Sequence, residues 1–170
     1  RRWAAFSDEL FDDPTYADTL LLLSAAGVRD STPHALARSF EANWDLVETH
    51  VDPAAPPPSD SRPLVADLLD RVDEVTGLAA ECDDPADKLL ARLTEVTTWA
   101  DGVRALPSGV AQVQALRDAR APGGISFRSR AGRGDCWRSP VDRVRGDLRA
   151  LEDDVDEVLS QIAQRCAHHL

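Results

Sequence analysis

The sequence has no methionine, and among its 170 residues it has only one lysine, one tyrosine and three cysteines. The absence of methionine indicates that Arg1 is not an initiating residue, so we expect a domain of a larger protein. Cys82, Cys136 and Cys166 are too few and too widely spaced for a disulfide framework, which favours a reducing compartment and a cytoplasmic location. Eighteen arginines against one lysine are typical of a GC-rich prokaryotic genome.

Long hydrophobic runs are also missing. The run from Leu20 to Leu23 is short, no segment approaches the roughly 20 apolar residues that cross a bilayer, and the first residues do not resemble a signal peptide. We therefore expect no membrane partner. The sequence also lacks a phosphate-binding glycine loop, a G-x-S-x-G elbow and an H-E-x-x-H motif, so we expect no catalytic residue, metal or cofactor.

What the sequence does contain is a set of helix-start signals. A capping residue followed by proline precedes an apolar pattern of helical period four times, because proline fits the first helical position and the side-chain oxygen before it accepts from free amides. These pairs are Asp13-Pro14, Thr32-Pro33, Asp84-Pro85 and Ser139-Pro140. The pattern predicts an all-α fold of about seven helices.

The expected helices cover residues 3–11, 14–26, 33–49, 63–78, 85–103 and 108–121, and a long last helix begins near residue 139. Gly27 is expected to end the second helix as a left-handed cap. The last helix has apolar residues at alternating steps of three and four, which form a heptad seam: Val141, Val144, Leu148, Leu151, Val155, Val158 and Ile162. We expect this seam to pack against the fourth and fifth helices in an antiparallel bundle, although a coiled-coil dimer uses the same spacing and the oligomeric state stays open.

The predicted domain organisation has three parts. Residues 1–51 form an N-terminal helical cluster, and residues 52–62 form a proline-rich connector. Residues 63–170 form a three- or four-helix bundle that contains a basic loop at residues 122–139. The pattern is compatible both with a separate cluster and with one that packs on the bundle as a single domain.

Positive charge is concentrated in one segment of this chain, although the chain as a whole is acidic, with a formal net charge of −11. Residues 117–149 hold nine arginines and four acidic residues, whereas the regions on either side are acidic. Within this arginine-rich segment we expect partner contacts from Arg128, Arg130, Arg133 and Arg138, with Phe127 and Trp137 available to stack on bases if the partner is a nucleic acid.

Three functional interpretations follow. The preferred one is a non-catalytic interaction or assembly domain that binds a protein partner, since the arginines can hold either an acidic partner or an acidic face of the same bundle. The alternative is an accessory domain that contacts DNA or RNA through residues 117–149. A more remote alternative is an all-α enzyme with helix-borne carboxylates and histidines, such as those around His50.

Two cysteine sites offer weaker hypotheses. Cys136 lies between Arg133 and Arg138, and nearby arginines lower the pKa of a thiol by stabilising the thiolate. Cys166, His168 and His169 are zinc-ligand types but lack the paired spacing of structural zinc sites. The simpler interpretations are an ordinary buried cysteine and a histidine-bearing helix end, respectively.

Overall fold

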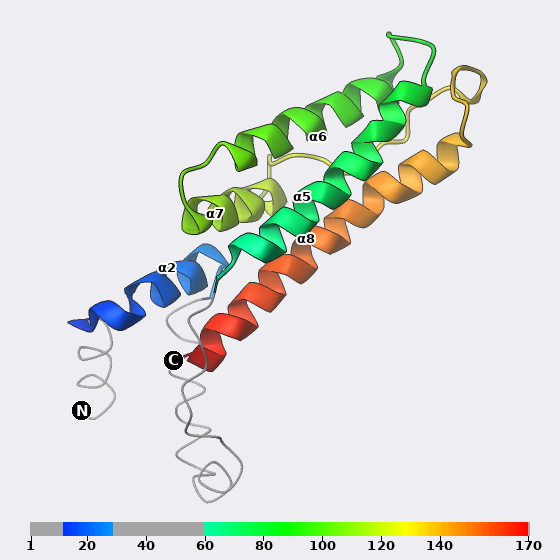
Figure 1. The fold of residues 1–170 in the computed structure, drawn as a ribbon. Helices are drawn as coiled ribbons and strands as arrows, with labels where there is room; N and C mark the ends of the chain where they lie inside the picture. Colours follow the sequence, from blue (N-terminus) through cyan, green and yellow to red (C-terminus); the bar gives the residue numbers. More distant parts are fainter. Residues whose placement is uncertain (1–11, 29–59, 170) are drawn as a thin grey trace, which may run out of the picture.

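The computed structural model describes residues 12–28 and 60–169, and this part of the chain is helical (Figure 1). Its α-helices are α2 (Ala17–Ala25), α5 (Arg62–Thr76), α6 (Lys88–Arg104), α7 (Gly109–Arg120) and α8 (Val141–His169). Short 3-10 turns occur at Pro14–Tyr16, Gly77–Glu81 and Gly134–Cys136. The all-α class is therefore confirmed for the described residues, while the helices expected at 3–11 and 33–49 and most of the connector lie outside them.

The longest helix of the described residues, α8, runs antiparallel to the shorter α5 and also packs against α2 and α7 (Figure 1). All members of the predicted seam are buried except Val158, which is half-buried. From α5, residues at helical spacing face this seam and the rest of the core: Val65, Leu68, Leu69, Val72 and Val75. The apolar residues of the heptad seam are therefore buried within the chain itself. Burial of this apolar surface holds α5 and α8 together. None of the helices in the described ranges combines the length and the apolar character needed to span a bilayer.

The neighbours of α8 differ from the expected arrangement. We expected α8 to lie against both α5 and α6, but α6 packs on α5 and α7 and has few direct contacts with α8. The segment between α7 and α8 fills the space instead: Phe127 contacts Trp99 of α6, and Gly132 lies against Leu89 of α6 and Val141 of α8. A non-helical segment therefore supplies part of the core.

Helix α2, which we assigned to the N-terminal cluster, packs on α7 and α8 (Figure 1). Gly27 ends it as predicted, with φ +91°, while the amide of Val28 donates to the carbonyl of Leu23 and the amide of Gly27 to that of Ser24. Arg117 of α7 donates to the same Ser24 carbonyl at 2.9 Å. This cation at the end of α2 fixes the helix to the bundle and is favoured by the helix dipole.

The start of α6 corrects the predicted capping site. Asp84-Pro85 lies in a turn, and the cap is Asp87, whose Oδ1 accepts from the amides of Leu89 at 2.7 Å and Leu90 at 3.3 Å. Pro85 is therefore not the first helical residue, because the helix begins at Lys88, just before the apolar pair Leu89 and Leu90. Ser108 caps α7 by accepting from the amide of Ala111, close to the expected start of this helix.

Candidate functional site

The arginine-rich segment is held on the surface of α8 by Arg145. The guanidinium of this residue donates to three consecutive carbonyls, those of Arg130 at 3.1 Å, Ala131 at 2.9 Å and Gly132 at 3.1 Å. A planar guanidinium offers several donors in a fixed geometry, so one side chain satisfies a stretch of backbone that forms no helix of its own. The backbone of residues 130–132 is therefore fixed on α8.

Further along α8, Glu152 joins two arginines of the segment. It accepts from Arg120 at 2.8 Å and from Arg128 at 2.5 Å, and Arg120 also binds Asp156 at 2.7 Å. Hydrogen bonds from Arg128 and Arg120 lower the pKa of Glu152, and the bond to Asp156 is the main reason that the pKa of Arg120 is raised. Arg120 and Glu152 are mostly buried, whereas Arg128 keeps 65% of its side chain exposed.

Arg133 and Arg138 lie at the end of the bundle where α5 connects to α6. Arg133 pairs with Asp84 at 3.2 Å, and Arg138 pairs with Asp83 at the same distance. Both arginine side chains are exposed by 65% or more. Exposed pairs of this kind contribute little to stability, so both guanidinium groups remain accessible to a partner carboxylate.

Two exposed arginines of the segment, Arg130 and Arg149, have no ion-pair or hydrogen-bond partner for their side chains within the described residues. Arg149 lies four residues after Arg145 and three before Glu152, on the stripe of α8 that faces residues 128–132. The carbonyl of Arg130 accepts from Arg145, so the backbone of Arg130 lies beside this stripe. Arg128, Arg130 and Arg149 are exposed on this stripe or on the loop beside it, and we call these three residues the arginine patch.

Arg149 was counted in the segment but not selected as a site residue from the sequence. Its spacing from Arg145 and Glu152 puts it on a stripe that carries polar side chains into contact with the loop. That spacing is readable from the sequence, but only the structure shows which side of α8 the loop covers.

The two aromatic residues expected to stack on bases are buried. Phe127 is 1% exposed and meets Trp99 edge to face, and Trp137 is 7% exposed and pairs with Cys82 in an isolated antiparallel bridge. Both rings contribute to the core because the loop has little other apolar surface with which to cover α6 and α8. In this fold neither ring is available to stack on a base.

The end of the bundle also brings together Cys82, Cys136 and Asp87. Asp87 uses its second oxygen, Oδ2, to accept from the amide of Arg133 at 2.9 Å and lies 3.6 Å from the sulfur of Cys136. The expectation of a lowered thiol pKa is wrong: burial raises the pKa of Cys136, and the adjacent Cys82 and the Asp87 carboxylate raise it further. The guanidinium of Arg133 is paired with carboxylates, which limits the stabilisation it can give a thiolate.

The described residues contain no cluster of three or more histidine, cysteine, aspartate or glutamate side chains that could hold a metal ion. Cys166 is fully buried in the core. The hypotheses on His50, His168 and His169 fall on residues or side chains outside the described part.

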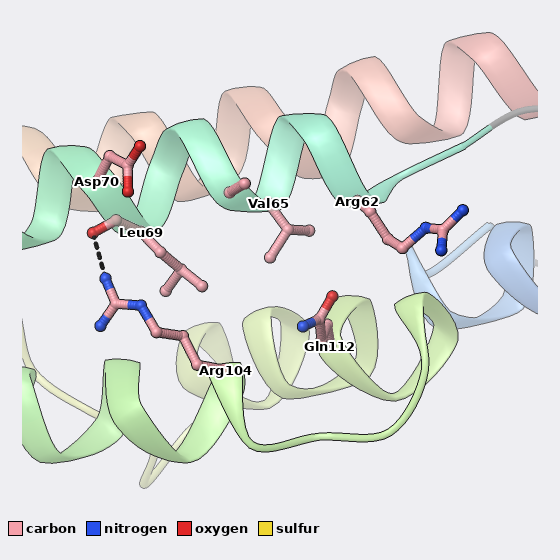
Figure 2. A pocket seen from close by; sticks show the side chains of 7 residues that line it. Arg62, Val65, Leu69, Asp70, Arg104 and Gln112 are labelled. Carbon is pink, nitrogen blue, oxygen red and sulfur yellow. Dashed lines mark hydrogen bonds between the residues drawn. The ribbon is translucent and has the colours of Figure 1, made fainter.

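A separate cleft of about 350 Å³ lies between α5 and the helices α6 and α7 (Figure 2). Arg104 reaches across it from α6, donating to the carbonyl of Leu69 at 3.0 Å and to Asp73 at 2.5 Å. Arg62 at the other end is paired with Asp60. The lining residues include one carboxylate, that of Asp70, and no histidine, so the cleft presents no acid–base pair.

No protein-family model matches the chain, and neither the curated proteins nor the solved structures include one with significant similarity to it.

Proposed function

We propose that this chain is a non-catalytic interaction domain of a larger protein and that its arginine patch binds an acidic segment of a partner protein. One observation carries the proposal: Arg130 and Arg149 are exposed and have no side-chain partner among the residues that the structure describes, and the backbone of residues 130–132 is held on α8 by Arg145. Guanidinium groups bind carboxylates through paired hydrogen bonds, and a loop that is already ordered loses less entropy on binding.

The surroundings of the patch favour a protein over a nucleic acid. Nearby acidic residues neutralise much of the segment, since Glu152, Asp156, Asp83 and Asp84 all come from outside it and pair with its arginines. Phosphates at the bundle end would meet Asp83, Asp84 and Asp135 as well as arginines. A partner with a few well-placed carboxylates avoids this repulsion because each carboxylate can bind one exposed guanidinium.

The second contact area in this proposal is the bundle end, where Arg133 and Arg138 are exposed. Their ion pairs with Asp84 and Asp83 are exposed, so a partner carboxylate can replace either aspartate at small cost.

We also propose that the N-terminal cluster and the bundle form one domain, because α2 packs on α7 and α8 and Arg117 fixes its end.

The test is a fluorescence anisotropy titration with three labelled probes: a glutamate-rich peptide, single-stranded DNA and double-stranded DNA. Each is titrated with the wild-type chain and with the double variant Arg130→Ala, Arg149→Ala at low and at physiological salt. The matched control is Arg71→Ala, Arg92→Ala, which removes the same charge from exposed ion pairs on α5 and α6.

We expect salt-sensitive binding of the acidic peptide that weakens by about tenfold or more in the patch variant and changes little in the control. Equal loss in both variants would show a general charge effect and contradict the proposal. Tighter binding of DNA than of peptide, lost in the patch variant, would favour the nucleic-acid alternative instead. No binding of any probe at low salt would remove the patch as an interaction site.

A further inference from the structure

Cys82 and Cys136 are 54 positions apart in the sequence but meet at one end of the bundle. Cys82 follows the 3-10 turn after α5, and Cys136 ends the turn before α8. The amide of Asp83 donates to the carbonyl of Cys136 at 2.8 Å, and the amide of Arg138 donates to that of Glu81 at 3.0 Å. These two bonds form the isolated antiparallel bridge between Cys82 and Trp137.

The bridge brings the backbones of the two cysteines side by side. In an antiparallel bridge of this type the facing Cα atoms, here those of Cys82 and Trp137, are about 4.5 Å apart, and Cys136 directly precedes Trp137 in the chain. Disulfides join Cα atoms that are roughly 4.4–6.8 Å apart. The side chain of Cys82 is also near enough to that of Cys136 to raise its pKa. Both cysteines are unpaired thiols in the structure.

The surroundings of the two sulfur atoms differ. Cys82 is half-buried, and its sulfur lies 3.4 Å from the carbonyl of Asp84. Cys136 is buried, and its thiol donates to the carbonyl of Arg133 at 3.1 Å and faces the carboxylate of Asp87. Because Cys82 is the more exposed of the two, an oxidant from solvent reaches Cys82 before Cys136.

We propose that Cys82 and Cys136 form an oxidisable pair, which a peroxide closes into an intramolecular disulfide between the α5–α6 connection and the loop before α8. This pairing does not depend on the proposed function. It needs no rearrangement of the helices, because the backbones of the two segments are already hydrogen-bonded to each other.

The chemistry takes place in two steps. The sulfur of Cys82 attacks one oxygen of hydrogen peroxide, the O–O bond breaks, and the thiol proton leaves with the departing hydroxide as water, giving a sulfenic acid. The sulfur of Cys136 then attacks the sulfur of Cys82, the S–O bond breaks, and the hydroxyl leaves with the Cys136 proton as a second water. Two thiols are oxidised by two electrons, and one peroxide is reduced to two waters.

The buried position of Cys136 makes a kinetic prediction. Its pKa is raised by burial and by its neighbours, so little thiolate is present at neutral pH. The second step should therefore accelerate as the pH rises into the alkaline range, because the thiolate is the nucleophile in disulfide formation.

The test treats the folded chain with hydrogen peroxide and measures the intact mass and the peptide map. We expect the wild type to lose the mass of two hydrogens and to yield one cross-linked peptide that contains Cys82 and Cys136. Cys166→Ser is the matched control and should behave like the wild type. Cys82→Ser should remain folded but fail to cross-link, and dithiothreitol should reverse the change in the wild type.

Thermal melting gives a second measurement. A disulfide between Cys82 and Cys136 closes a long loop and so restricts the unfolded chain. The oxidised wild type should therefore melt higher than the reduced protein by about 5–10 °C. Cys82→Ser should show no such increase. Oxidation of Cys82 to a sulfinic acid with Cys136 still free would overturn the proposal, and so would a cross-link that involves Cys166. An unchanged wild-type mass after prolonged treatment would do the same.

Discussion

Trp99 of α6 and Phe127 of the segment between α7 and α8 meet edge to face, with ring centroids 5.4 Å apart and ring planes at 81°. Phe127 has the largest volume of the fully buried side chains in the described residues. Through this contact a segment without regular helix becomes part of the core. Phe127 therefore anchors the loop just before Arg128 and Arg130 of the arginine patch.

Replacing Phe127 with alanine should lower the free energy of unfolding by about 3–5 kcal/mol, because it leaves a cavity beside Trp99 and removes a large buried ring. Urea unfolding followed by circular dichroism measures this loss. Ile125→Ala, a change at a half-buried position of the same segment, is the control and should cost clearly less. Equal effects from the two variants would show that Phe127 has no special place in the core.

Gly132 is required by its backbone conformation and by its neighbours. Its φ is +111°, and a Cβ there would lie 3.0 Å from Leu89 Cδ2 and 3.1 Å from Val141 Cγ1. Gly132→Ala should therefore destabilise the fold by about 1–3 kcal/mol through strain. Gly134→Ala is the matched control, since its φ is not positive and a Cβ there meets nothing within 4 Å. Thermal melting of both variants measures the difference, and similar melting temperatures would contradict the requirement for glycine at position 132.

Asp87 connects the start of α6 to the loop before α8 with its two carboxylate oxygens. Asp87→Ala should lower the free energy of unfolding by about 2 kcal/mol, because the helix loses its cap and the Arg133 amide loses its acceptor. Asp84→Ala removes the cap expected from the sequence and should cost less, because among the described residues the Asp84 carboxylate binds only the nearby Ala86 amide and the exposed Arg133. The opposite order in urea unfolding would restore Asp84-Pro85 as the helix start.

The same carboxylate predicts a pH dependence. Burial raises the pKa of Asp87, but hydrogen bonds from the amides of Arg133, Leu89 and Leu90 outweigh it, so the pKa is lowered. A lowered pKa means that the ionised group stabilises the fold fully above its unfolded value of about 4 and that this contribution is lost as the pH falls through the folded value. The stability difference between the wild type and Asp87→Asn should be constant near neutrality and shrink below about pH 4. A difference that grows in acid would contradict this sign.

Leu148 tests the seam of α8. It is 0% exposed, and Leu148→Asp would place an unpaired charge in the core, so we expect loss of the cooperative thermal transition. Ser160→Asp introduces the same charge at an exposed position of the same helix and should leave the melting curve nearly unchanged. If Leu148→Asp also melts like the wild type, the seam is not part of the core.

The arginine-rich segment shows where sequence reasoning stops for the site. The local excess of positive charge was visible, and so was the lack of helical pattern between residues 122 and 139. Which arginines are neutralised was not visible, because Glu152, Asp156, Asp83 and Asp84 lie far from them in sequence. The burial of Phe127 and Trp137 was hidden for the same reason, since exposure depends on which helices the loop covers.

The sequence by itself determined the helical class, the Gly27 cap of α2 and the buried stripe of α8, because helix periodicity and capping depend on residues within a few positions of one another. Only the tertiary structure decided that Asp87 rather than Asp84 caps α6, that a loop separates α6 from α8, and that Cys82 lies beside Cys136. These relationships join segments that are distant in the chain or compete with an equally good local signal. They are set by packing, which selects the arrangement that buries the most apolar surface while satisfying the polar groups of the loop.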